Sequence, residues 1–284
     1  MTELKYFNIL RIGLRHNFIK LWKVIDEYKK FEHIYSRISE VMRKLNIRDN
    51  IMWNKLNVDL EYERLIRNNV KILTFWDNDY PTLLREIYIP PLGIYVKGDT
   101  KCFNERTNLA VVGSRHPTDY GERAVEKIIR ELNGVDVNII SGLAIGLDSC
   151  SHKNALKFGL KTIGVIGSGF AHFAPKRNIW LAKEIIKNGG AVVSEYPICF
   201  TPEKYYFIER NRIITGMSKG VLLVEAKRKG GTMASARFAE EQNRDIFVIP
   251  NNILIENGEG TNWLIKEGAK MVDSGEDIIN EMNL

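Results

Sequence analysis

Three absences narrow the classes of protein to which this chain of 284 residues can belong. Cysteine is scarce, and Cys102, Cys150 and Cys199 are single and far apart, which leaves neither a disulfide framework nor a CxxC metal-binding knuckle. No apolar run approaches the roughly 18 residues that span a membrane, and the first residues lack the apolar segment of a signal peptide. We therefore expect a cytoplasmic protein that does not engage a membrane.

Two common nucleotide-binding motifs are also missing. A dinucleotide site needs GxGxxG after the first strand and an acidic residue about 20 positions later. The chain instead has GSRHPTDYG from residue 113 and Ser141-Gly142 after the second predicted strand. No GxxxxGK[ST] motif occurs, and GSGF at 167–170 lacks the GxSxG frame of a nucleophile elbow. These absences predict that the chain performs neither dinucleotide redox chemistry nor Walker-type ATP hydrolysis and that it needs no cofactor.

Positive charge is concentrated at one end of the chain. Residues 1–75 hold 15 basic and 9 acidic side chains, whereas residues 76–284 hold 26 of each. A small basic domain suits a polyanionic partner, although a solvated helical surface explains the excess equally well. Within 76–284 the basic residues gather in predicted loops, so a neutral domain can still present a positive edge.

The spacing of apolar residues predicts two domains. In residues 4–69 apolar side chains recur at helical spacing, for example at Phe18, Leu21 and Ile25, which predicts a small basic helical domain over 1–75 with Trp22 and Trp53 in its core. Residues 76–284 form the second predicted domain, and we expect no winged helix after it.

In the second domain, apolar strands alternate with glycine turns and helices. This alternation predicts an α/β fold with a mostly parallel sheet and helices on both faces. Strands are expected at 109–112, 137–140, 162–166, 191–194, 220–224, 246–249 and 270–272, after a strand at 70–76 and an edge strand from Leu92. Helices are expected at about 120–133, 148–158, 178–188, 206–216 and 232–242.

The turn after the strand LAVV (109–112) is a candidate anion site. Gly113 lets the backbone approach a ligand closely, the start of the next helix carries partial positive charge, and the planar fork of Arg115 fits a phosphate. Similar turns follow later strands as SGLAIG (141–146), GSG (167–169) and KGGT (229–232). Because ligands bind beyond the carboxyl ends of parallel strands, these turns are expected at one edge of the sheet.

Two sets of carboxylates are candidates for chemistry. Asp148 and His152 are four residues apart on a predicted helix and could act together in acid–base chemistry or bind a metal ion. Simpler roles explain them better: Asp148 favours the start of the helix, and His152 can hydrogen-bond to the adjacent loop. Glu195 and Glu225 each follow a strand. They could do acid–base work, or they could pair with arginines that hold the loops.

The densest polar stretch runs from Lys204 to Arg212, KYYFIERNR. Its mixture of cations and aromatic rings is typical of sites that hold single-stranded nucleic acid. A helix whose Phe207 packs inward and whose arginines pair with acids explains the same residues equally well.

Eight sequence blocks lie between residues 75 and 272. The blocks are VVGSR (111–115), SGLAIGLDSCSH (141–152), GVIGSG (164–169), SEYP (194–197), FIERNRIITGMS (207–218), VLLVEA (221–226), GGTMASARFA (230–239) and GTNWLIKEGA (260–269). In their order and spacing they resemble the DprA/Smf family of DNA-processing proteins. The resemblance implies an extended Rossmann-like domain behind a small SAM-like helical domain. It also implies a homodimer without catalytic activity that binds and protects single-stranded DNA and loads RecA during natural transformation.

The resemblance also implies a set of DNA-binding residues. They are Gly113, Ser114, Arg115, Ser141, Gly142, Lys176, Lys204, Phe207, Arg210, Asn211, Arg212, Gly231 and Thr232. We expect a phosphate between Arg115, the Ser141-Gly142 turn and Arg212, with Phe207 stacked on a base. The chain departs from the family at Ala174-Pro175, where the family has Tyr-Pro, and at Pro250-Asn251, where it has Pro-Gly.

Two other functions compete with this one. GGTMASARFAEE (230–241) loosely resembles the PGGxGTxxE segment of nucleotide phosphoribohydrolases, in which a carboxylate assists cleavage of an N-glycosidic bond. A scaffold that binds only protein through the basic helical domain is the third possibility.

Overall fold

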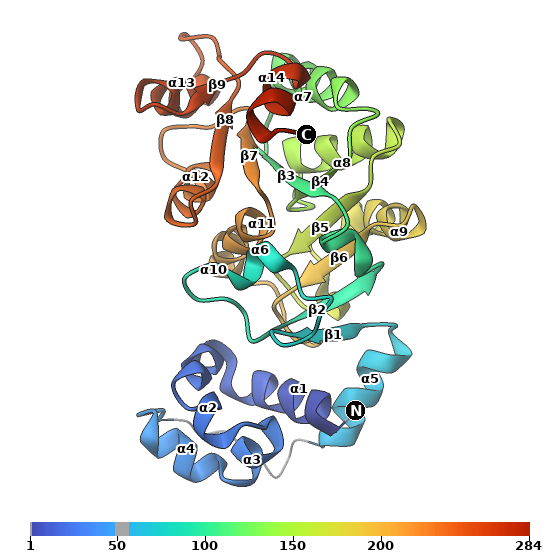
Figure 1. The fold of residues 1–284 in the computed structure, drawn as a ribbon, viewed down its shortest axis with the longest axis vertical. Helices are drawn as coiled ribbons and strands as arrows, with labels where there is room; N and C mark the ends of the chain where they lie inside the picture. The colour runs from blue at the N-terminus through green and yellow to red at the C-terminus, as the bar shows by residue number, and fades with distance from the viewer. Residues whose placement is uncertain (1, 49–56) are drawn as a thin grey trace.

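The computed structural model describes residues 2–48 and 57–284, which form a helical part and an α/β part (Figure 1). The helical part contains α1 (Thr2–Leu14), η1 (Arg15–Lys23), α2 (Ile25–Tyr28), α3 (Phe31–Ser36), α4 (Ile38–Lys44) and α5 (Val58–Arg67). The apolar residues of helical spacing over 18–25 therefore lie in two elements, a 3-10 helix and a short α-helix. Trp22 donates its ring N–H to the Pro90 carbonyl at 2.9 Å, and Trp53 lies outside the described residues.

Within the described residues, nine strands form one sheet in the order β1-β2-β6-β5-β4-β3-β7-β8-β9. The strands are β1 (Lys71–Thr74), β2 (Gly93–Gly98), β3 (Thr107–Val112), β4 (Val137–Ser141), β5 (Thr162–Ile166), β6 (Ala191–Ser194), β7 (Gly220–Leu223), β8 (Asp245–Val248) and β9 (Lys270–Met271). β2 pairs antiparallel with β1 and β6, and every other pairing is parallel. The predicted mostly parallel sheet is confirmed.

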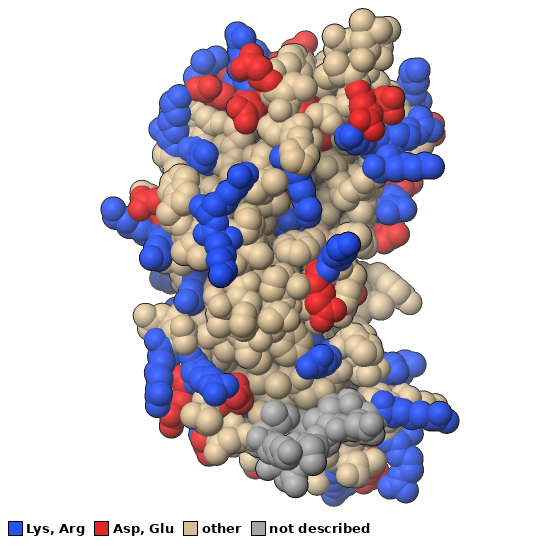
Figure 2. Space-filling view, turned by 180° about the vertical axis from the view of Figure 1, so that it is seen from behind, with Lys and Arg blue, Asp and Glu red and all other residues tan. Residues whose placement is uncertain are grey.

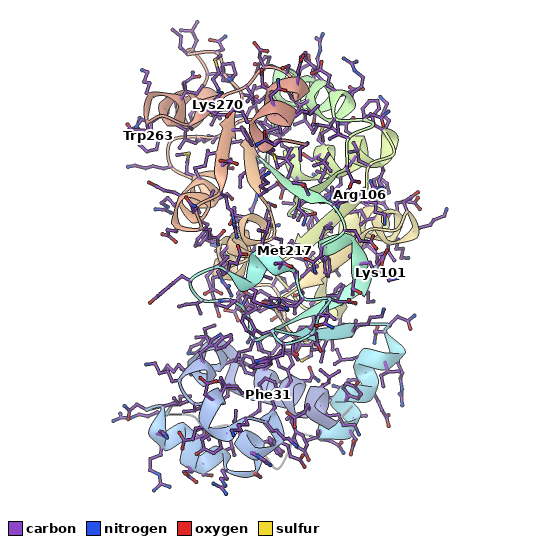
Figure 3. All side chains as sticks on the ribbon, viewed as in Figure 1. Phe31, Lys101, Arg106, Met217, Trp263 and Lys270 are labelled. Carbon is purple, nitrogen blue, oxygen red and sulfur yellow. The ribbon has the colours of Figure 1, made fainter. Side chains whose placement is uncertain are left out.

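Helices cover both faces of this sheet. They are α6 (Thr82–Arg85), α7 (Asp119–Glu131), α8 (Leu147–Lys157), α9 (Ile179–Lys187), α10 (Lys204–Glu209), α11 (Asn211–Gly216), α12 (Gly231–Glu241), α13 (Glu256–Lys266) and α14 (Gly275–Met282). Alternate residues of β3 point to opposite faces, so Leu109 and Val111 pack with α7 and α14, while Ala110 and Val112 pack with α11 and α12. In Figure 3, Met217 lies within the α/β part and Phe31 within the helical part.

The strand order reverses next to β3. From β3 the chain builds β4, β5 and β6 outward on one side, and it then returns to place β7 on the other side of β3. The loops after β3 and β7 therefore diverge from the same edge of the sheet. In open α/β sheets this point is where ligands bind.

The helical part and the sheet share a hydrophobic core. The Phe7 ring packs over Gly93 so closely that a Cβ there would lie 2.7 Å from it. Tyr95 of β2 donates its hydroxyl hydrogen to Asn8 Oδ1 at 2.9 Å, and Ile72 of β1 is buried in the same cluster. The sheet thus begins at Lys71, before the boundary predicted between residues 75 and 76.

We expect Phe7→Ala to lower the free energy of unfolding by about 3–5 kcal/mol, because it leaves a cavity between α1 and β2. Ile66→Ala, at a side chain that is 57% exposed on α5, should change it by less than about 0.5 kcal/mol. Urea denaturation followed by circular dichroism measures both values. Similar losses for the two variants would contradict the shared core.

Candidate nucleic-acid groove

A groove of about 540 Å³ lies where the strand order reverses. It is bounded by the loop after β3, the loop between β7 and α12, and helix α10. Nine predicted residues line it, namely Gly113, Ser114, Arg115, Lys204, Phe207, Arg210, Asn211, Gly231 and Thr232. The structure thus brings together segments that are more than a hundred residues apart in the sequence.

Arg115 and Phe207 form the exposed part of the groove. The guanidinium carbon of Arg115 lies 5.8 Å from the centroid of the Phe207 ring, a cation–π distance. Arg115 is exposed and Phe207 is half-buried, and no carboxylate in the described ranges pairs with Arg115. Gly113 is required beside them because a Cβ there would lie 2.3 Å from the Leu147 side chain. The cation is therefore free of an ion pair, and the ring that it lies over is partly exposed at the groove.

Arg210 lines the same groove but is 4% exposed, and its guanidinium is used internally. Nη1 donates to the Val165 carbonyl at 2.8 Å, and Nη2 lies 3.6 Å from Asp148 Oδ2. Burial raises the pKa of Asp148, and the charge of Arg210 opposes this rise. Gly142 leaves room for Arg210, because a Cβ there would lie 1.6 Å from Nη1. Arg210 and Gly142 therefore build the groove wall.

The structure does not bring Arg115, the Ser141-Gly142 turn and Arg212, the predicted phosphate site, together in one groove. Ser141 is fully buried, and its hydroxyl donates to the Val111 carbonyl at 2.6 Å. Arg212 lines a different cavity of about 290 Å³, where its Nη2 binds both carboxylate oxygens of Glu195 at 2.5 Å. Residues two apart on a helix face different directions, so Arg210 and Arg212 cannot reach the same groove.

Lys176 is exposed in the 3-10 helix η5 (Lys176–Asn178) and does not line the groove. The helix is nevertheless tied to the groove wall. Asn178 Nδ2 donates to the carbonyls of Leu143 at 2.9 Å and Ala144 at 3.1 Å, and Ala144 lines the groove. Lys176 therefore lies beside the groove and not inside it.

Lys227, Lys229 and Ser235 also line the groove, and of these only Lys229, in the KGGT turn, was singled out from the sequence. Lys227 and Lys229 come from the loop before α12, and Lys227 pairs with Glu256 at 2.5 Å. Ser235 Oγ is buried at the groove and has no hydrogen-bond partner among the described residues. The run KRKGG (227–231) directly before a predicted helix is the signal that would have identified Lys227 as well.

The two strand-end glutamates have structural roles. Glu225 is fully buried and accepts hydrogen bonds from the Thr118 N–H at 3.0 Å and from the Thr118 hydroxyl, which holds the loop after β3. Glu195 pairs with Arg212, which agrees with the predicted alternative that it holds a loop through an arginine. Glu241, the last residue of the segment that resembles the phosphoribohydrolase motif, lines the cavity of Arg212 and not the groove. Among the described residues that line the groove, the acidic one is Asp148, and it forms an ion pair with Arg210.

Asp148 and His152 do not act on a common ligand. The Thr162 hydroxyl donates to the Ile139 carbonyl at 2.7 Å, so His152 Nδ1, 2.6 Å from Thr162 Oγ1, must carry the ring proton. Burial lowers the pKa of His152 to about 3. Within residues 2–48 and 57–284, no three His, Cys, Asp or Glu side chains gather in a way that could hold a metal ion.

The fold and the groove define a class of protein, the doubly wound α/β proteins with a cationic groove at the reversal of strand order. Within that class, a family model described as "DNA recombination-mediator protein A" matches residues 71–283. The chain belongs to this family. In the described part of the chain, no helix combines the length and the apolar character needed to cross a bilayer.

Two relatives carry the name "DNA processing protein DprA". The protein of Bacillus subtilis is 39% identical over 203 residues, 72% of this chain and 68% of that protein. The protein of Streptococcus pneumoniae is 42% identical over 205 residues, 72% of each chain. The resemblance that the sequence blocks indicated is confirmed.

Two solved structures have a similar fold. The X-ray structure of DprA from Streptococcus pneumoniae has a TM-score of 0.74 at 37% identity and covers 81% of this chain and 79% of that one. A Helicobacter pylori structure, described as showing the single-stranded DNA binding mode of DNA processing protein A, has a TM-score of 0.67 at 31% identity. It covers 75% of this chain and 95% of that one.

We expect the stability of the protein to fall as the pH drops from about 6.5 to about 5. Unfolded histidine binds a proton below about 6.5, whereas folded His152 stays neutral down to about 3. This difference removes up to about 1.4 kcal/mol of unfolding free energy per pH unit. Urea titrations at several pH values should show a shallower dependence for His152→Asn than for the wild type. An unchanged slope for His152→Asn would overturn the assignment.

Proposed function

We propose that this protein binds single-stranded DNA along the groove, with phosphates on Arg115, Lys204 and Lys229 and a base against Phe207. The exposed guanidinium of Arg115 over the Phe207 ring carries this proposal. The Helicobacter pylori relative, described as a single-stranded DNA binder, supports it.

The same geometry supports binding without sequence preference. Cations attract every phosphate alike, and an aromatic ring stacks on any base. The amides at the start of α12 add donors for a phosphate, because Gly230 and Gly231 have open space around them. The acid that lines the groove is occupied by Arg210, so we also propose that the protein acts by binding rather than by catalysis.

We further propose that the protein acts as a homodimer that protects incoming strands in the cytoplasm and loads RecA on them during natural transformation. The family's description as a recombination mediator supports this role. A dimer would hold a longer stretch of strand than one groove does. Strand held through its phosphates leaves most base edges accessible to a second protein. The basic helical domain, residues 1–75, is expected to contribute positive charge.

The affinity for oligo-dT should fall steeply with salt. With roughly three phosphates neutralised, by Arg115, Lys204 and Lys229, the slope of log affinity against log salt is about −2, because each phosphate on a single strand contributes about −0.7. Arg115→Ala should weaken binding roughly tenfold for every base composition and reduce the slope by about 0.7. Fluorescence anisotropy at several salt concentrations measures both quantities.

Arg123→Ala provides the matched control, since Arg123 is an exposed arginine on α7 that lines a different hollow. Its affinity and slope should remain those of the wild type. A slope near zero for the wild type, or an Arg115→Ala variant that binds as tightly, would refute the groove as the binding site.

RecA loading is tested by assembling RecA filaments on oligo-dT that is first covered by a single-strand-binding protein. Wild-type protein should shorten the lag of filament formation several-fold, and Arg115→Ala should lose most of this effect because it holds the strand weakly. Filament growth is followed by RecA ATP hydrolysis. An unchanged lag in the presence of wild-type protein that binds oligo-dT would exclude the loading role and leave strand binding intact.

A further inference from the structure

We propose a second contact site for the strand outside the groove, on helix α9, with Trp180 as a stacking platform for a base. The site, called here the α9 patch, consists of Trp180 with Lys153, Lys176, Arg177 and Lys183. The inference rests on the proposed binding of single-stranded DNA and extends its path.

Trp180 is not needed by the core. It is 51% exposed, whereas Leu181, Ala182 and Ile185 of the same helix are buried against the sheet. The Nζ atom of Lys153 on α8 lies 5.8 Å from the Trp180 ring centroid. An exposed indole with a cation beside it can stack on a base while the ammonium binds the adjacent phosphate.

The cations of the α9 patch are available to a ligand. Lys153, Lys176, Arg177 and Lys183 are exposed, and none pairs with a carboxylate within the described residues. Neighbouring Lys157, by contrast, is held by Glu126 at 2.7 Å. α9 itself carries one acid, Glu184, which is half-buried. In Figure 2, α9 is turned to the left margin, where most of the coloured side chains are Lys and Arg.

The α9 patch continues the groove. Asn178, between Arg177 and Trp180 in the chain, is bound to the carbonyl of Ala144 at 3.1 Å, and Ala144 lines the groove. The four steps along the helical backbone from Lys176 to Trp180 advance by roughly 6–8 Å. A strand that leaves the groove past Ala144 therefore comes to the segment that carries Lys176 and Trp180.

The composition of the α9 patch favours nucleic acid over a protein partner. Its apolar part is limited to Trp180 and the 38% exposed Ile179, which is too little for the hydrophobic centre of a protein interface. Cations around one exposed ring are instead the mixture that holds single strands.

The test compares oligo-dT of 6 nucleotides, which fills the groove alone, with oligo-dT of 20 nucleotides, which can reach α9. Trp180→Ala should weaken the long oligonucleotide about fivefold or more and leave the short one unchanged, because base stacking is lost only outside the groove. Trp180→Phe should restore most of the affinity. Tyr88→Ala, at a 92% exposed aromatic residue that lines the other cavity, is the matched control and should bind both lengths as the wild type does.

A second variant and a second readout keep the test decisive. Lys153→Glu should weaken the long oligonucleotide selectively even if the tryptophan variant folds poorly. Long oligo-dT should quench the fluorescence of the wild type more than that of Trp180→Phe, since the indole stacks on a base. Equal effects on both lengths, or none from either variant, would overturn the α9 patch.

Arg115→Ala separates this failure from that of the groove. If Arg115→Ala weakens both lengths while the α9 variants change nothing, the proposed function stands and the α9 patch falls. If Arg115→Ala also changes nothing, both proposals fail together.

Discussion

The buried guanidinium of Arg210 holds together the pieces of chain that form the groove. It reaches the end of β5 through the Val165 carbonyl, α8 through Asp148 and the turn after β4 through Gly142. Its own position between α10 and α11 sets where Phe207 stands relative to Arg115. A charge that is buried in this way stabilises one arrangement only while each of its partners is in place. The pair of Arg115 and Phe207, which we propose contacts the strand, thus depends on the buried cation of Arg210.

Acidic side chains near the groove are already occupied, whereas several cations are not. Asp148 faces Arg210, Glu195 binds Arg212, Glu225 binds Thr118, and Glu256 binds Lys227. The charges of the rim cations are therefore not cancelled locally, even though residues 76–284 hold as many acids as bases. Distribution, and not net charge, makes this edge of the sheet attractive to a polyanion.

Much of the fold follows from local patterns in the sequence. Apolar runs that end in glycine turns predicted the parallel strands, because strands buried on both faces read as continuous apolar segments. The helix predicted over 206–216 is two helices that meet at Arg210, whose buried ion pair depends on contacts distant in sequence. Helices α13 and α14 escaped prediction. Helix α13 has an interrupted apolar pattern, with Gly258 and Gly260 buried against the loops before it.

Individual site residues were harder to predict than the fold. Arg115, Lys204 and Phe207 were predicted as site residues, and all three line the groove. Arg115 was recognisable from its glycine turn after a strand, and the other two from the mixture of cations and rings around them. Ser141 and Arg212 do not line the groove, because their side chains point elsewhere in the fold, which the resemblance alone does not reveal. The first is the last residue of a fully buried strand, and the second lies two positions from Arg210 and so on another side of the helix.

Glu195 joins the helical part to the sheet. Its carboxylate binds Arg212 of α11, and its main-chain carbonyl accepts a hydrogen bond from Arg11 of α1 at 3.2 Å. Together with the Phe7 contact to β2, this residue locks the basic helices to the frame that carries the groove. In the structure, these contacts therefore set the spacing between the charged surface of the helices and the groove.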